Sequence, residues 1–230
     1  MAHMNTTALL YAFLGGFLPA LVWLWFWLHE DRLHPEPRSA LALTFFGGMC
    51  AALLAYGAER AVLGWGLAFT TTLIWWAVIE EVFKFAFAYW FAIRRRVCDE
   101  PIDAMIYMLT AALGFAALEN TLFLFAPLSD GNVLQGLMTG NLRFVGATLL
   151  HIAASSIVGA CAAFAFYRGR RAHEIAIFAG LAIAVGLHAL FNIIINMQTN
   201  RSLLAGFIVA WAAIVVVLAI FEKVKRIKTR

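Results

Sequence analysis

The chain has 230 residues, of which 63% are hydrophobic and only 13% are charged. Soluble domains average about 45–50% apolar and about 25% charged residues, so this composition leaves too little polar surface for a soluble globule. It argues against a disordered chain, a disulfide-rich scaffold and an ordinary cytosolic enzyme. The mean hydropathy of +0.85 agrees. The composition predicts a multi-pass membrane protein, in which the net charge of +4 is first a topology signal and not a sign of nucleic-acid binding.

Seven apolar segments are long enough to cross a bilayer, which requires about 20 residues each. Isolated strands cannot satisfy their backbone hydrogen bonds in lipid, and barrel strands would alternate between polar and apolar residues, so all seven are predicted to be helices. We expect an all-α, polytopic helical bundle that forms one integral-membrane domain over residues 1–230, with Met1–Met4 resembling a cloning scar. The predicted spans are Thr7–Leu28, Ser39–Gly57, Trp65–Ile93, Ile102–Phe125, Leu142–Tyr167, Ile175–Met197 and Leu203–Phe221.

The basic residues are distributed unequally between the two sides on which seven spans place their loops. Thirteen of the 17 Lys and Arg residues fall on one side, two fall on the other, and Lys84 and Arg143 lie inside predicted spans. By the positive-inside rule, the N-terminus is expected outside and the C-terminus in the cytoplasm, with the Pro127–Gly140 loop external. The basic side receives Arg32, Arg38, Arg94, Arg95, Arg96, Arg168, Arg170, Arg171, Lys223, Lys225, Arg226, Lys228 and Arg230.

An ionisable side chain inside a span is costly and marks a candidate functional site. The third span carries Glu80-Glu81-Val-Phe-Lys84, in which Lys84 lies one turn further along and between the two carboxylates around the helix. One lysine neutralises only one carboxylate, and two adjacent glutamates form a coupled pair that loses its second proton reluctantly. Such a carboxylate suits a general base for water. The alternative is a buried ion pair that orients the helix.

Three further spans carry polar side chains at a similar depth. At 1.5 Å per residue, Glu119, His151 and His188 each lie roughly 10–15 Å below the outer surface, and Glu80 and Glu81 lie near the midplane. Taken alone, each suits an ordinary hydrogen bond between helices. Their convergence from four helices on one layer predicts instead a water-containing cavity that is reached from outside.

The ordered set Glu80-Glu81-x-x-Lys84, Phe115-x-x-x-Glu119-Asn120 and His188-x-x-x-Asn192 resembles the PrsW family of intramembrane proteases. That family belongs to the wider superfamily of CAAX prenyl proteases, whose CAAX branch has histidine in the second motif and arginine after the paired acids. The resemblance covers about half the chain and implies a catalytic core at about 65–197. It also implies a bacterial cytoplasmic (inner) membrane enzyme that cleaves single-pass membrane proteins near their extracytoplasmic side, including the first cut of an anti-sigma factor.

The roles expected of the site residues follow from their chemistry and from this resemblance. The Glu80/Glu81 pair is expected to activate water, and the sequence leaves open which of the two is the base. His188 and Asn192 are expected to stabilise the oxyanion, and Glu119 to position water or protonate the leaving amine. The supporting residues are Lys84, Asn120, His151 and Arg143.

No cofactor is expected, because the sequence has no HExxH motif and the CAAX relatives are understood as metal-independent. Zinc is the alternative, with ligands among Glu80, Glu81, Glu119, His151 and His188. The expected partners are a single-pass membrane substrate and the lipid bilayer, and the oligomeric state is left open. Two other functions are alternatives: a proton- or ion-coupled transporter with a Glu/His relay, and a non-catalytic scaffold that binds a partner helix. The transporter would need access from both sides, whereas the cytoplasmic halves of these spans are apolar.

Overall fold

The structure is a computed structural model that describes residues 6–31 and 35–227. The proposed scar Met1–Met4 and three members of the charge count (Arg32, Lys228 and Arg230) lie outside the described residues. Every regular element of the described part is a helix, which confirms the predicted all-α class. The elements are α1 (Thr6–Glu30), α2 (Arg38–Leu63), α3 (Phe69–Ala88) with its π-helical continuation η1 (Tyr89–Ile93), α4 (Pro101–Ser129), α5 (Val133–Leu142), the π-helical η2 (Arg143–Ala147), α6 (Thr148–Phe164), α7 (Arg170–Asn196) and α8 (Asn200–Val224).

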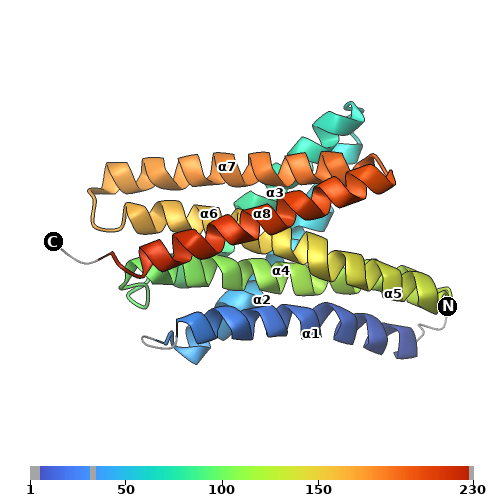
Figure 1. The fold of residues 1–230 in the computed structure, drawn as a ribbon, viewed down its shortest axis with the longest axis horizontal. Coiled ribbons are helices and arrows are strands. Elements are labelled where there is room, and N and C mark those ends of the chain that lie inside the picture. Colours follow the sequence, from blue (N-terminus) through green and yellow to red (C-terminus); the bar gives the residue numbers. More distant parts are fainter. Residues whose placement is uncertain (1–5, 32–34, 228–230) are drawn as a thin grey trace.

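Seven long helices result, because α5, η2 and α6 follow one another without a break. Six of the seven are long and apolar enough to cross a membrane. The remaining helix, α3, has 20 residues. Three of them, Glu80, Glu81 and Lys84, are charged and make the helix less apolar. The helices lie side by side, and α1 begins at the end of the bundle opposite to the one where α8 ends (Figure 1). This arrangement fits a multi-pass protein with an odd number of spans.

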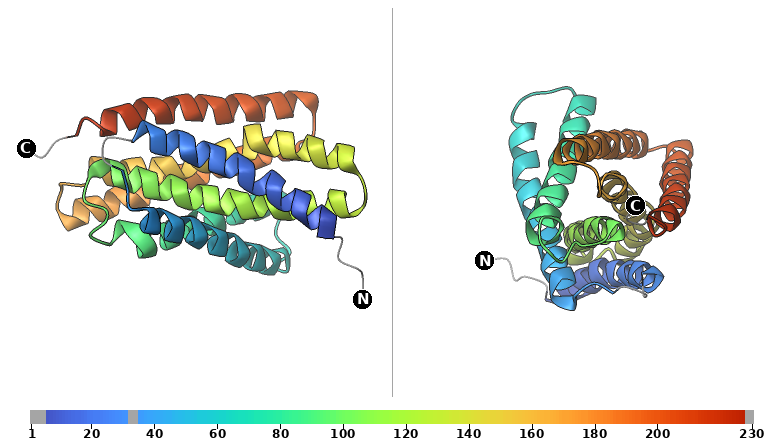
Figure 2. Two further views of the ribbon diagram at one scale, coloured as in Figure 1. Left: turned by 90° about the horizontal axis from the view of Figure 1, so that it is seen from below. Right: turned by 90° about the vertical axis from the view of Figure 1, so that its left-hand side faces the viewer.

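Helix α4 forms the centre of the bundle, with α6 beside it and the other helices around them (Figure 2). Its apolar stretch is 94% buried. Small residues allow this close packing: a methyl group on Gly48 of α2 would overlap the backbone of Ala111, and one on Gly114 of α4 would overlap the backbone of Phe45. Because van der Waals packing and not hydrophobic burial drives helix association in lipid, such close approaches fix the position of α4 and of the Glu119 that it carries.

The prediction that Pro127–Gly140 is a loop is wrong, because most of this segment is helical. Helix α4 continues through Pro127, which removes only one backbone N–H from the last turn. Helix α5 starts soon afterwards, capped by Asn132, whose side chain accepts a hydrogen bond from the Gln135 backbone N–H at 3.1 Å. Only residues 130–132 connect the two helices.

The connection between the second and third spans also differs from the prediction. Helix α2 continues past Gly57, and Arg60 is accommodated on it by donating a hydrogen bond to the Tyr56 hydroxyl, one turn back, at 3.0 Å. Trp65 was expected to open the third span but lies in the connection before α3. The chain turns there at Gly66, whose φ of +65° is readily adopted by glycine.

The orientation of the bundle can be tested with reporter fusions. A reporter inserted in the 130–132 connection is expected to be extracytoplasmic, and reporters after Arg96 and Arg171 are expected to be cytoplasmic, because those arginines belong to the basic side of the charge count. Alkaline phosphatase and green fluorescent protein activities measure the two outcomes. An extracytoplasmic reporter after Arg96 would contradict the orientation.

Candidate active site

Lys84 lies at the centre of a buried polar cluster. Its ammonium has no exposed surface, and it donates hydrogen bonds to Glu81 Oε1 at 2.8 Å, Glu80 Oε2 at 3.4 Å and His151 Nδ1 at 2.8 Å. It also lies 4.3 Å from the centre of the Phe115 ring, a cation–π contact. The spacings of three and four residues place both glutamates on the same side of α3 as the lysine. The prediction that Lys84 lies between the two carboxylates is therefore confirmed.

Glu81 is fully buried, and its two oxygens accept hydrogen bonds from three side chains. Lys84 and His188 Nδ1 both contact Oε1 at 2.8 Å, and the Ser155 hydroxyl donates to Oε2 at 3.1 Å. A carboxylate can only accept, so the Nδ1 of His188 carries a proton and donates it. The Nε2 of a neutral His188 is then left with a free lone pair.

Glu119 joins α4 to η2 and α6 through two basic side chains, Arg143 and His151. His151 Nε2 lies 3.0 Å from Glu119 Oε2, and Arg143 forms an ion pair with the same oxygen. Since Lys84 donates to His151 Nδ1, the proton of the neutral imidazole is on Nε2 and points at Glu119. Arg143 also donates to the Asn120 side-chain oxygen at 2.5 Å. Arg143 begins the π-helical turn η2, a departure from regular helix that often occurs at functional sites.

Glu80 faces two imidazole nitrogens without a hydrogen bond to either. Its Oε2 lies 3.7 Å from His188 Nε2 and 3.8 Å from His151 Nδ1. With the tautomers above, Glu80 Oε2 and His188 Nε2 are both hydrogen-bond acceptors and face each other. The gap between them suits a proton, a water molecule or a cation. The cluster also contains three carboxylates but only two permanent cations, so one negative charge remains to be balanced.

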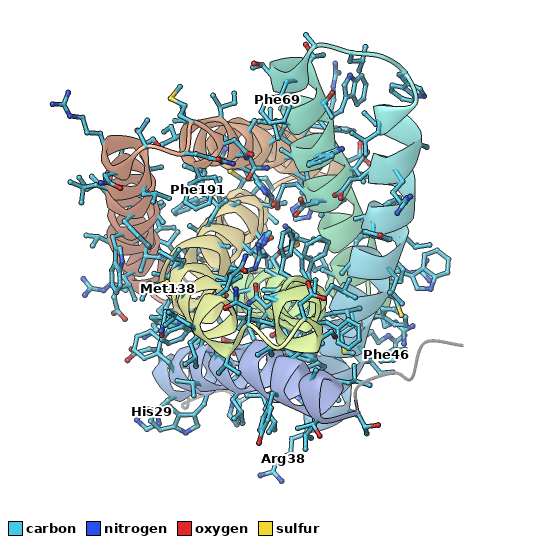
Figure 3. The ribbon with its side chains drawn as sticks, turned by 90° about the vertical axis from the view of Figure 1, so that its right-hand side faces the viewer. His29, Arg38, Phe46, Phe69, Met138 and Phe191 are labelled. Atoms are coloured by element: carbon cyan, nitrogen blue, oxygen red, sulfur yellow. The ribbon has the colours of Figure 1, made fainter. Side chains whose placement is uncertain are left out.

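A cavity of about 810 Å³ opens above this cluster, between α2, α3, α4, α6 and α7. It reaches the ends of α2 and α7 that the charge count places outside. Figure 3 views the bundle from this end, with Phe191 between α7 and the central helices. The candidate residues that line the cavity are Glu80, Glu119, Arg143, His151, His188 and Asn192.

The predicted convergence of four helices on one layer is confirmed by these contacts. Asn192 lies on the cavity wall one turn beyond His188, but in the described part of the chain its side chain makes no hydrogen bond to the Lys84 cluster. Sequence reasoning missed two residues. Ser155 follows His151 by four residues and so shares its helix face, a signal that was available. Glu59 also lines the cavity, but it lies beyond the predicted end of the second span.

Together, the fold and the cluster define a polytopic membrane protein with a buried carboxylate–imidazole site. The chain belongs to the PrsW family, because residues 36–220 match the family described as "PrsW family intramembrane metalloprotease". This confirms the resemblance seen in the motifs, all of which fall inside the matched range. "Protease PrsW" of Geobacillus kaustophilus (strain HTA426) is 27% identical over 115 residues, which are 49% of this chain and 51% of that relative. The chain therefore matches about half the length of this relative. No solved structure matches the chain.

Two adjacent serines offer a matched test of the cluster. Ser155 and Ser156 are both fully buried, but only Ser155 donates to Glu81, and the Ser156 hydroxyl has no hydrogen-bond partner among the described residues. Ser155→Ala is expected to lower the free energy of unfolding by about 1.5–3 kcal/mol, the usual range for a hydrogen bond to a charged group. Ser156→Ala is expected to be nearly neutral. Unfolding in detergent measures both variants, and equal losses would contradict the assignment.

Proposed function

We propose that this protein is an intramembrane protease in which Glu80 activates the attacking water. The observation that carries the proposal is the placement of Glu80 and Glu119, from α3 and α4, on the wall of one cavity at the predicted outer end of the bundle. Cations hold both carboxylates in place, the buried Lys84 at Glu80 and the partly buried Arg143 at Glu119. A positioned carboxylate at a cavity floor is the arrangement that general-base catalysis requires.

Glu80 suits the base better than Glu81 does. Glu81 is enclosed by Lys84, His188 and Ser155, so its lone pairs are engaged and it lies away from the cavity. Glu80 lines the cavity and contacts Lys84 only at 3.4 Å. In the proposed reaction, Glu80 takes a proton from water while the water oxygen bonds to the carbonyl carbon. The C–N bond then breaks as a proton passes to the amine nitrogen.

The remaining cavity residues are assigned to the charges that develop during this reaction. His188 and Asn192 lie one turn apart on α7 and both line the cavity. The Asn192 amide is the proposed donor to the carbonyl oxygen as it becomes negative, and His188 joins it only as an imidazolium, because its Nδ1 proton is donated to Glu81 and a second proton is then needed on Nε2. Glu119, held by Arg143 and His151, is proposed to position the water or to hand a proton to the leaving amine.

The same residues also fit a divalent cation such as zinc. One oxygen of Glu80 and one nitrogen each of His151 and His188 lie within 4.8 Å of one another, which is a two-histidine, one-carboxylate donor set. Each imidazole is backed by a carboxylate, as is usual for metal-bound histidines. When bound, such an ion would polarise the water. The Lys84 ammonium competes with it, because it contacts two of the same three residues, and we therefore favour the metal-independent mechanism.

The proposed substrate is a single-pass membrane protein cut near its extracytoplasmic side, with an anti-sigma factor as the specific case and the bacterial inner membrane as the location. This proposal is supported by family membership and by the opening of the cavity at the predicted outer end. The cytoplasmic half of α4 is packed with Met105, Ile106 and Leu109, none of which has exposed surface. The same half also buries Asp103, Tyr107 and Thr110, so it is family membership that favours the protease over the transporter.

Substitution of the carboxylates tests the proposed base. Glu80→Gln is expected to lower cleavage of a single-pass membrane substrate by about 10²–10⁴ with little loss of stability, because the amide cannot accept the proton. Glu81→Gln is expected to lower both cleavage and stability, because Lys84 and His188 lose their partner.

Glu59→Gln is the matched control, since it removes a carboxylate from the same cavity wall without touching the Lys84 cluster. Its cleavage rate is expected to stay within about threefold of the wild-type rate, whereas loss of a general base lowers the rate by about 10² or more. Normal cleavage by Glu80→Gln would show that Glu80 is not the base.

Metal removal separates the two mechanisms. Protein that is purified with a chelator and shown by elemental analysis to be free of metal is expected to keep its activity, because Glu80 and Lys84 supply the base and the positive charge. Loss of activity that returns with added zinc, together with loss of bound zinc in His188→Ala, would assign Glu80, His151 and His188 as metal ligands.

A further inference from the structure

A second pocket adjoins the reaction cavity on the side of α8. It has a volume of about 240 Å³ and lies between α4, α5, η2, α7 and α8. Arg143 is the one charged group among its described lining residues, and most of the others are apolar. The pocket lies directly beside the reaction cavity, because the two share a wall formed by Phe123, Arg143, Ala147, Phe191 and Ile195.

The wall between the two spaces is held in a fixed position. Arg143 lines both of them and is anchored by its ion pair with Glu119 and its hydrogen bond to Asn120. Gly146, one turn along η2, lets the ring of Phe207 approach, since a Cβ at Gly146 would lie only 3.2 Å from that ring. The pocket is therefore built from packed side chains of five helical segments, and Arg143, in the wall that it shares with the reaction cavity, contacts Glu119.

We propose that this pocket is a specificity subsite that takes a large apolar side chain of the substrate, one or two residues from the bond that is cut. The inference rests on the proposed protease function. An extended peptide advances about 3.3 Å per residue, so a chain whose carbonyl lies beside Glu80 and Glu119 passes Arg143 within one or two residues. The charge of Arg143 is already balanced by Glu119, and the pocket therefore offers a neutral, apolar environment.

The side of α8 that lines the pocket differs from the side expected to face lipid. Leu203 and Phe207 line the pocket and are partly buried, whereas their neighbours Leu204 and Ile208 are 61% and 60% exposed. The lipid contacts of α8 are thus made by one set of residues and the pocket by another. The wall that the pocket shares with the reaction cavity makes the substrate, and not a lipid chain, the proposed occupant.

The test compares Leu203→Trp, which fills the pocket, with Leu204→Trp on the neighbouring, exposed position. Each full-length variant and the wild type cleave a pooled library of apolar peptides in detergent, and mass spectrometry identifies every cut. The wild type is expected to prefer Leu, Ile, Phe or Met over Ala by about tenfold or more in kcat/KM at one position next to the cut. Leu203→Trp is expected to lose this preference while it still cleaves peptides with Ala there, and Leu204→Trp to keep it.

The outcomes separate the subsite from the protease function. Cleavage with the same preference in Leu203→Trp as in the wild type, or an equal loss on all peptides, would overturn the subsite and leave the protease standing. The same holds if both tryptophan variants change the preference alike, since lipid contact would then explain it. No Glu80-dependent cleavage by the wild type, of the pool or of single-pass membrane substrates, would overturn both proposals.

Discussion

The rest of the structure depends on the burial of the Lys84 ammonium. A charged group removed from water costs several kcal/mol unless partners surround it, so Lys84 must be met by acceptors wherever α3 packs. Two of them, Glu80 and Glu81, come from its own helix, and the third, His151, comes from α6. Glu81 in turn engages His188 of α7. One buried charge therefore fixes how three helices are arranged around the site.

This arrangement separates the groups that hold the site from those that face the cavity. Lys84 and Glu81 are fully enclosed and form the support, whereas Glu80 and Glu119 line the cavity where a substrate would lie. Arg143 forms an ion pair with Glu119, as Lys84 does with Glu80. Arg143 begins the π-helical turn η2, which places the arginine between the reaction cavity and the neighbouring apolar pocket. Arg143 is thus proposed to contribute to catalysis, by holding Glu119, and to substrate selectivity, by lining the apolar pocket.

The parts of the site that follow from local spacing were predictable, and those that need tertiary contacts were not. The position of Lys84 between two glutamates follows from helix geometry alone, and counting depth along each helix placed His151 and His188 in the same layer. No sequence pattern shows that His188 binds Glu81 through Nδ1, which leaves Nε2 facing Glu80. Glu59 was missed because the second span was predicted to end at Gly57, whereas α2 continues to Leu63.

A double-mutant cycle between Lys84 and Glu81 tests the central claim most directly. The free energy of unfolding is measured in detergent for Lys84→Met, Glu81→Gln and the double variant. We expect Lys84→Met to cost about 3–5 kcal/mol, because it leaves buried carboxylates without their cation. The double variant is expected to be more stable than the sum of the single losses predicts, by about 1–3 kcal/mol. Losses that simply add would show that the two residues act independently, and would contradict a site organised by the buried lysine.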